Sequence, residues 1–268
     1  MDAFAIAGVL GLIVGLVLAL TGAGGGVIAI PLLVFGLHLP VQQAAPVGLV
    51  AVGLAAALGA ALGLSQGIVR YRAAGLIGLA GMSAAPLGVI AAQHLPNRPL
   101  LSAFAVVLIY TAFRMLRTTA DATPNTENIP CRVEDGAAHL IWTRQCARAL
   151  FGTGLVSGFL SGLLGVGGGF VIVPALRHHT DLSLRSVQAT SLAVIALVSI
   201  SSVSAAALQG SVPWTIGVPF TGGALTGLLS GRQFSKKVNP KILQSAFAWF
   251  ALFVAMLMLA RAIGWLQS

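Results

Sequence analysis

Long apolar runs, interrupted by short polar or glycine-rich breaks, fill most of this sequence. About 20 helical residues cross the roughly 30 Å hydrocarbon core of a bilayer. The fuller runs are residues 3–20, 42–64, 73–93, 98–117, 147–164, 186–208, 214–232 and 242–263. They predict an all-α polytopic membrane protein with about eight full transmembrane helices.

Two shorter apolar segments, residues 26–37 and 168–177, each follow or begin within a cluster of glycines. The clusters comprise Gly22, Gly24, Gly25, Gly26, Gly165, Gly167, Gly168 and Gly169. Glycine in a helix interior costs about 1 kcal/mol relative to alanine, so each cluster is expected to end the helix before it. The segments hold 12 and 10 residues, and at 1.5 Å per residue they cover roughly half of the hydrocarbon core. We therefore expect two half-helices that begin near the middle of the bilayer.

The two halves of the chain look like copies of one unit. At a shift of 143 residues, "GAGGGVIAIPLL" at 22–33 falls on "GVGGGFVIVPAL" at 165–176, with six of twelve positions identical. Gln66 and Gly67 fall on Gln209 and Gly210 at the same shift. The sequence therefore predicts an internal duplication, with a first transmembrane repeat at 1–117, a connector at 118–146 and a second repeat at 147–268.

The basic residues predict that the two copies have opposite orientations. Lysine and arginine mark the cytoplasmic side of a membrane. The loop after the third run of the first copy holds Arg70 and Arg72, whereas its counterpart at 209–214 holds no basic residue. The next loop shows the reverse, with Arg98 alone in the first copy and a basic cluster in the second, Arg232, Lys236, Lys237 and Lys241. The arginines in and beside the connector predict that it is cytoplasmic. Inverted repeats of this kind are a transporter architecture.

Composition excludes a soluble protein, because 57% of the residues are hydrophobic and only 8% are charged, against about 25% charged in soluble domains. The net charge of +9 does not indicate nucleic-acid binding, since the bases sit at helix ends and in loops without interleaved aromatic residues. Asp2 is the only charge before the first run, which is therefore expected to be a retained span rather than a secretory signal. Cys131 and Cys146 are expected to be unpaired, and no metal or cofactor site is expected.

The half-helices suggest an anion site made of backbone. The start of a helix offers free N–H groups and a positive dipole end, and glycine lets a ligand approach them closely. The candidate substrate-binding residues are Gly24, Gly25, Gly26, Gly167, Gly168, Gly169, Gln43, Gln188, Thr190 and Ser191. The acids, Asp2, Asp121, Glu127, Glu134, Asp135 and Asp181, all lie outside the predicted spans. A membrane interior without carboxylates favours an anionic substrate over a cation.

Other small and polar residues are expected to serve helix packing. This interpretation applies to Gly8, Gly11, Gly15, Gly154, Gly158, Gly162, Ser199, Ser201, Ser202 and Ser204. It also remains an alternative for the two glycine clusters themselves, and interhelical hydrogen bonding remains an alternative for the two glutamines.

The paired glycine–proline motifs, each followed by a Gln-Ala pair in the next span, resemble the sulfite exporter family known as TauE/SafE. Residues 187–192, "VQATSL", match the second-copy pattern, whereas the first copy has Ala45-Pro46 in place of Thr190-Ser191. The resemblance implies a multi-pass carrier of the cell inner membrane for sulfite or organosulfur anions such as sulfoacetate or thiosulfate.

Together these features predict a transporter, more specifically an exporter, that moves a small anion by alternating access around a site at the membrane midplane. The expected partners are the anion and the lipid bilayer, and the sequence leaves open whether the chain forms a homo-oligomer. Two alternatives stay open. One is a non-transporting accessory subunit of the membrane. The other is an intramembrane enzyme using Ser157 in "GLVSG", although no histidine lies at depth in the second copy to activate it.

Overall fold

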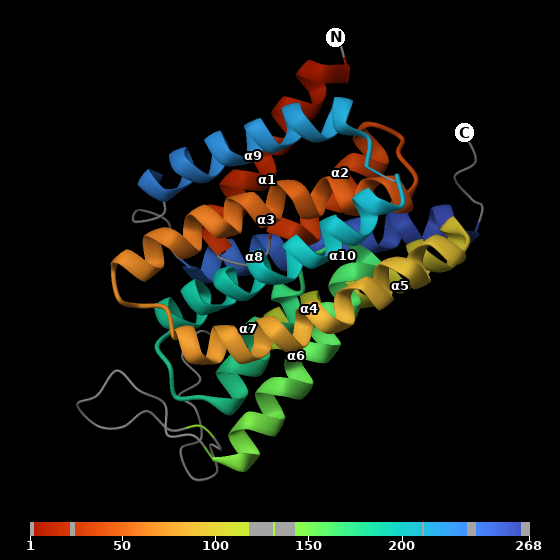
Figure 1. The fold of residues 1–268 in the computed structure, drawn as a ribbon. Coiled ribbons are helices and arrows are strands. Elements are labelled where there is room, and N and C mark those ends of the chain that lie inside the picture. The colour runs from red at the N-terminus through yellow and green to blue at the C-terminus, as the bar shows by residue number, and fades with distance from the viewer. Residues whose placement is uncertain are drawn as a thin grey trace.

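The structure is a computed structural model that describes residues 3–21, 25–117, 131, 143–210, 212–234 and 240–263. Within these ranges the chain forms ten helices and no strand (Figure 1). The helices are α1 (Ala3–Thr21), α2 (Gly25–Gly36), α3 (Val41–Ser65), α4 (Tyr71–His94), α5 (Asn97–Arg117), α6 (Arg144–Leu164), α7 (Gly169–His179), α8 (Leu184–Leu208), α9 (Trp214–Phe234) and α10 (Pro240–Ile263). The all-α prediction is confirmed, and each predicted run agrees with its helix to within three residues at either end.

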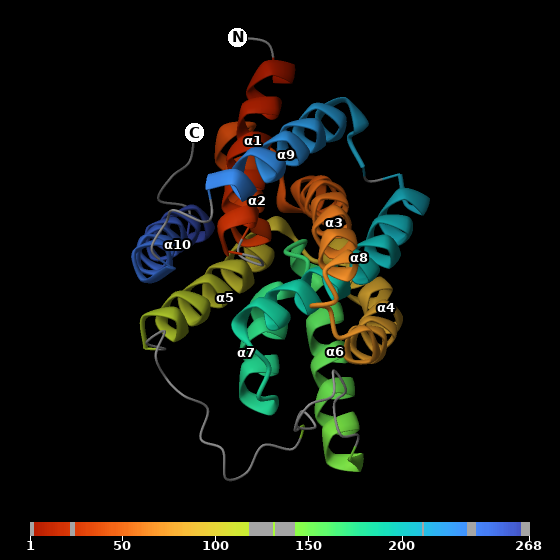
Figure 2. The ribbon, with the colours of Figure 1, turned by 90° about the vertical axis from the view of Figure 1, so that its left-hand side faces the viewer.

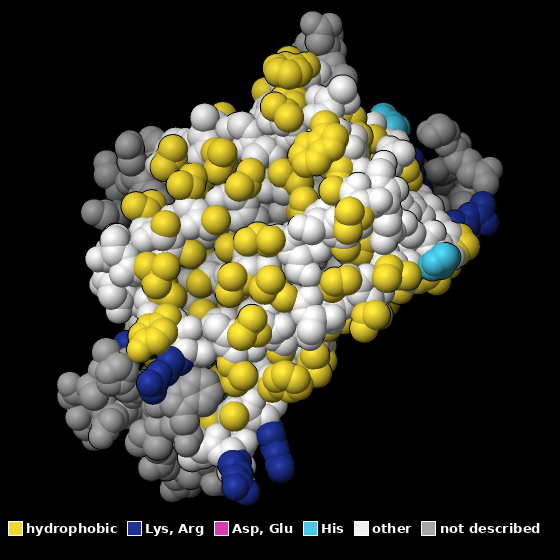
Figure 3. All heavy atoms as spheres, viewed as in Figure 1, with side chains coloured by type: hydrophobic (Ala, Val, Ile, Leu, Met, Phe, Trp, Pro, Cys, Tyr) yellow, Lys and Arg dark blue, Asp and Glu magenta, His cyan; other side chains and the backbone are white. Residues whose placement is uncertain are grey.

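Four of the described helices are both long and apolar enough to cross a membrane. They are Val41–Ser65, Tyr71–His94, Arg144–Leu164 and Arg185–Leu208. Four other apolar stretches in the described part of the chain are shorter, namely Phe4–Leu20, Gly25–Gly36, Asn97–Phe113 and Ala248–Ala262. Large apolar side chains cover much of the face in Figure 3, and the arginines and lysines visible there gather at its edges. This distribution is that of a multi-pass membrane protein, whose apolar sides face lipid.

Glycines join the first helix of each half to a helix of the other half. A Cβ on Gly15 of α1 would lie 1.9 Å from the carbonyl oxygen of Ala224 in α9. A Cβ on Gly158 of α6 would lie 2.2 Å from the carbonyl oxygen of Gly81 in α4. At both seams backbone touches backbone, so only glycine fits. The prediction that the glycines of α1 and α6 serve close helix packing is confirmed.

The directions of these helices follow from their contacts. Gly8 of α1 lies near Pro219 of α9, and Leu16 lies near Gly231, so α1 and α9 are parallel. The contacts of α4 with α6 also advance together in residue number, from Ile77 with Gly154 to Gly88 with Leu163.

Helices α3 and α8, the longest of the described helices, cross at the centre of the molecule in opposite directions. Gly53 of α3 lies against Ser199 of α8, and further along α3 Gly63 lies against Ala189. Helices α5 and α10 pack together at one side (Figure 2).

The two short helices fold back along the helices that precede them. Gly25 at the start of α2 lies against Leu18 of α1, and Gly36 at its end lies against Leu10. Gly168, just before α7, lies against Ser157 of α6. Each half therefore begins with a helical hairpin, α1–α2 or α6–α7, and in the second hairpin the glycine cluster forms the bend.

Each short helix is held at its carboxyl end by a distant part of the chain. The Arg261 guanidinium of α10 donates a hydrogen bond of 3.3 Å to the Val34 carbonyl oxygen and lies 5.6 Å from the centre of the Phe35 ring. In the second hairpin, the His179 carbonyl oxygen accepts a hydrogen bond of 3.1 Å from the Cys131 N–H.

The cysteines form a disulfide, so the expectation that they are unpaired was wrong. Cys131 is bonded to Cys146 in the first turn of α6, with the two Cα atoms 5.1 Å apart. The backbone of Cys131 also pairs with Thr180. Because Cys131 contacts the end of α7 and is bonded to the start of α6, the disulfide closes the base of the α6–α7 hairpin. A spacing of 15 residues is compatible with many arrangements, so the sequence carried no signal for this pairing.

Candidate functional site

The second glycine cluster forms a tight turn between α6 and α7. Gly165, Gly167 and Gly168 have φ angles of 74°, 75° and 72°, which lie in the left-handed region where a side chain is strained. Gly168 is the residue immediately before the first turn of α7, and its carbonyl accepts the N–H groups of Val171 and Ile172 at 3.0 and 3.1 Å. The glycines are therefore required by the backbone path, and the first N–H groups of α7 have no carbonyl of their own helix to bind.

Helices α3, α6 and α8 enclose this turn. A Cβ on Gly165 would lie 2.4 Å from the Ala45 Cα, and a Cβ on Gly168 would lie 2.8 Å from the Ser157 carbonyl oxygen. A Cβ on Gly167 would lie next to the side chains of Ile195 and Val52. The turn is thus a piece of irregular backbone buried in the protein interior, as its position in an apolar bundle requires.

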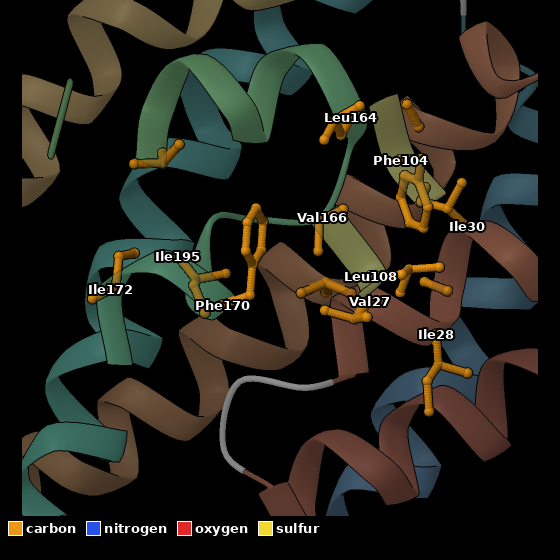
Figure 4. Packing of buried hydrophobic residues seen from close by; sticks show 14 of the residues in the cluster. Val27, Ile28, Ile30, Phe104, Leu108, Leu164, Val166, Phe170, Ile172 and Ile195 are labelled. Carbon is orange, nitrogen blue, oxygen red and sulfur yellow. The ribbon is translucent and has the colours of Figure 1, made fainter. Parts of the chain in front are cut away.

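The first cluster meets the second. Gly25 and Gly26 are buried at the start of α2, and a Cβ on Gly26 would lie 2.1 Å from the carbonyl oxygen of Val166. Figure 4 shows Val27, Val166 and Phe170 around this junction. Gly24, a predicted site residue, lies outside the described residues. The structure therefore brings the described parts of the two breaks into backbone contact, although they are 140 residues apart between Gly26 and Val166.

The predicted polar residues lie on α3 and α8. Thr190 is buried, and its Oγ1 accepts a hydrogen bond of 3.1 Å from the Arg70 N–H. Ser191 is also buried, and its hydroxyl donates a 2.8 Å bond to the Gln188 carbonyl oxygen. Gln188 is half-buried, whereas the Gln43 side chain is exposed. None of these four is among the nearest neighbours of Gly165, Gly167 or Gly168, and their role in binding remains a prediction.

Two hydroxyls that sequence reasoning did not assign to the site lie on α6 and α8, two of the helices that enclose the turn. Ser161 in α6 and Ser199 in α8 are buried, and their Oγ atoms have no hydrogen-bond partner in the part of the chain that the structure describes. Ser199 was expected to serve packing, and Ser161 was not considered. The spacing of Ser157 and Ser161, four residues apart on a glycine-rich helix, could have indicated a polar face. Among the described residues no three histidine, cysteine or acidic side chains gather as a metal site would need.

The fold and this junction define a class of protein, a multi-pass helical membrane protein in which two helical hairpins, α1–α2 and α6–α7, meet inside the bundle. The model of the sulfite exporter TauE/SafE family matches residues 7–258, and the chain belongs to this family. A "probable membrane transporter protein" of Xylella fastidiosa strain Temecula1 is 29% identical over 260 residues, covering 93% of this chain and 92% of the relative.

A second relative is the "probable membrane transporter protein YunE" of Bacillus subtilis, which is 26% identical over 89% of this chain and 90% of its own length. No solved structure matches the chain. The protein is therefore a membrane transporter of the TauE/SafE family, in agreement with the names of these relatives.

Proposed function

We propose that the protein moves a small anion, sulfite or an organosulfonate, across the cell inner membrane, in the direction of export. The observation that carries this proposal is the backbone contact between Gly26, at the start of α2, and Val166, in the turn between α6 and α7. The N–H groups that begin α2 and α7 supply positive partial charge at this junction without any fixed cation. An anion held in this way can leave again, because no arginine whose burial the structure describes is a buried residue that would trap it.

The charges of the described residues support an anion over a cation. Asp181 is the one acid in the described part of the chain, and its side chain is exposed. Cation carriers usually hold a carboxylate at depth. The buried polar side chains among the described residues are serines and threonines, which offer neutral donors.

We further propose that the halves are inverted repeats and that transport proceeds by alternating access between them. In support, α3 and α8 run in opposite directions, and the first helix of each hairpin runs parallel to a helix of the other half, α1 to α9 and α6 to α4. The matched glycines Gly67 and Gly210 also share one turn geometry, with φ angles of 67° and 66°. In transporters built this way, one repeat rocks against the other around a fixed site.

Labelling of matched positions tests the inversion. Gln66 and Gln209 are exposed counterparts that follow α3 and α8. In a chain whose native cysteines are replaced by serine, a membrane-impermeant maleimide applied to intact cells should label either Gln66→Cys or Gln209→Cys, but not both. Labelling of both variants from one side would contradict the inversion.

The same experiment fixes the side of the connector, which we propose is cytoplasmic. Among the described residues, Arg98 and Arg261 lie at the helix ends shared with Gln209, and the other basic residues lie at the ends shared with Gln66 and the connector. This bias places Gln66 in the cytoplasm. The disulfide in the connector favours the opposite side, because disulfides are rare in the cytosol. Labelling of Gln66→Cys in intact cells would overturn the cytoplasmic placement.

Anion flux in proteoliposomes tests the activity itself. Sulfite should cross at a rate well above that of protein-free vesicles, with potassium as the control ion. The double variant Gly25→Ala/Gly168→Ala should abolish flux, because each new Cβ would meet backbone or a packed side chain within 3.0 Å. Gly75→Ala/Gly222→Ala is the matched control, since nothing lies within 4 Å of either added Cβ.

Absence of flux together with copurification of a fixed partner would favour the accessory subunit. An intramembrane enzyme finds no support at Ser157, whose hydroxyl donates to the Gly154 carbonyl.

A further inference from the structure

Four of the buried hydroxyls on the described helices, those of Thr111, Ser157, Ser191 and Ser202, bond to a carbonyl one helical turn earlier. Ser157 donates to Gly154, and Ser202 donates to Val198 at 3.0 Å. This partner is available to any serine inside a helix. Ser161 and Ser199 do not use it, although their exposed fractions are 0% and 3%. A buried hydroxyl that leaves an available partner unused costs more stability than an ordinary hydrogen bond provides, so both positions need an explanation.

The two serines lie on two different helices, α6 and α8, that both pack against the same glycine turn. Ser161 is in the last turn of α6, and its own carbonyl accepts the N–H of Gly165, where the turn begins, at 2.8 Å. Ser199 lies one helical turn after Ile195, the closest neighbour of Gly167. Ser199 also packs on Gly53 of α3, next to Val52, which is the other neighbour of Gly167.

We propose that Ser161 and Ser199 are substrate-binding residues that donate hydrogen bonds to a small oxyanion at the Gly165–Gly168 turn. This inference rests on the proposed anion transport and adds side chains to a site so far made of backbone. An oxyanion presents several acceptor oxygens, and two hydroxyls on different helices, together with the first N–H groups of α7, can satisfy them from different directions. The serines differ in this respect from Ser191, whose hydroxyl already donates to Gln188.

The proposal predicts effects of opposite sign on stability and on binding. Ser161→Ala and Ser199→Ala each remove a hydroxyl that has no partner in the described part of the empty protein. The melting temperature of the purified protein without anion should therefore stay the same or rise. The rise in melting temperature that sulfite, thiosulfate or methanesulfonate produces should shrink, with the anion Kd weakened about tenfold or more per hydroxyl, because hydrogen bonds to charged groups are strong.

Two variants serve as matched controls. Ser202→Ala removes a buried hydroxyl that is already bonded within α8, so it should lower the melting temperature without anion and leave the anion-induced rise intact. Thr221→Val removes another buried hydroxyl without a partner among the described residues, but on α9, which packs along α1 and α3. It should behave like the two serine variants without anion and like wild type with anion.

Each outcome decides something. An anion-induced rise as large in Ser161→Ala and Ser199→Ala as in wild type would overturn this inference and leave the proposed function standing. Melting temperatures without anion that fall as far as that of Ser202→Ala would assign both hydroxyls to structure and overturn it as well. Wild-type protein that shows neither flux nor a melting shift with any of the three anions would overturn the proposed function and this inference together.

Discussion

Replacing Gly26 with alanine places one methyl group where the two broken helix pairs meet. The added Cβ would lie 2.1 Å from the Val166 carbonyl oxygen and 3.0 Å from its carbonyl carbon. Ordinary van der Waals contact begins at 3.4 Å, so the two breaks would have to separate by about 1.3 Å along this line. The Val166 atoms belong to the main chain, so no side chain can rotate away to make room.

The energetic consequence has two opposing parts. Forcing an extra carbon into a packed interior costs about 1–3 kcal/mol. Alanine is better than glycine in a helix by up to about 1 kcal/mol, which offsets part of that cost. Gly75→Ala in α4 is the matched control, because nothing lies within 4 Å of its added Cβ and only the helix gain remains. The two variants should therefore differ in unfolding free energy by about 1–3 kcal/mol.

Thermal unfolding of the detergent-purified protein measures this difference. At about 2–4 °C per kcal/mol for a chain of this size, Gly26→Ala should melt several degrees below Gly75→Ala. Anion flux in proteoliposomes should fall in Gly26→Ala and stay near the wild-type rate in Gly75→Ala. Equal melting temperatures and equal flux in the two variants would refute the reasoning, because the breaks could then separate without consequence.

The other tethers of the short helices give two further predictions. Cys146→Ser opens a loop of about 15 residues and should destabilise the protein by about 3 kcal/mol, because the unfolded chain gains conformational entropy. Wild type treated with dithiothreitol should melt at the same lower temperature. A wild-type melting temperature that does not change with dithiothreitol would count against the disulfide. Arg261→Gln removes the bond to Val34 and the contact with Phe35, and should cost about 1–2 kcal/mol. Arg98→Gln, at an exposed arginine near the same end of the bundle, is the comparison, and equal midpoints for the two arginine variants would contradict the tether.

The helices of this protein could be predicted from its sequence because a membrane-spanning helix needs an uninterrupted apolar run of nearly fixed length. The duplication stays a prediction, which gains support from the matched residues Gln66-Gly67 and Gln209-Gly210, since both pairs follow a helix and the two glycines share one turn geometry. The glycine spacing in α1 and α6 predicted close packing correctly. It could not name the partner helix, because small residues on a helix face indicate that a neighbour approaches and not which one.

The finer features of the candidate site depend on packing across the two halves, which local patterns do not encode. The contact of Gly26 with Val166 follows from how two hairpins meet. The hydroxyl of Ser199 looked like one of several packing serines, and only the loss of its usual carbonyl partner sets it apart. The disulfide was missed for the same reason, since two cysteines in or beside a polar segment say nothing about distance in space.

The seam between α1 and α9 has a consequence for how the chain is made. Helix α1 is made well before α9, but the surface that fits its glycine face belongs to α9, which begins at Trp214. Until α9 has been inserted, lipid or another protein must therefore cover that face of α1. A chain that stops before α9 would keep this unfilled face, which a membrane quality-control protease could recognise as a mark of incomplete synthesis.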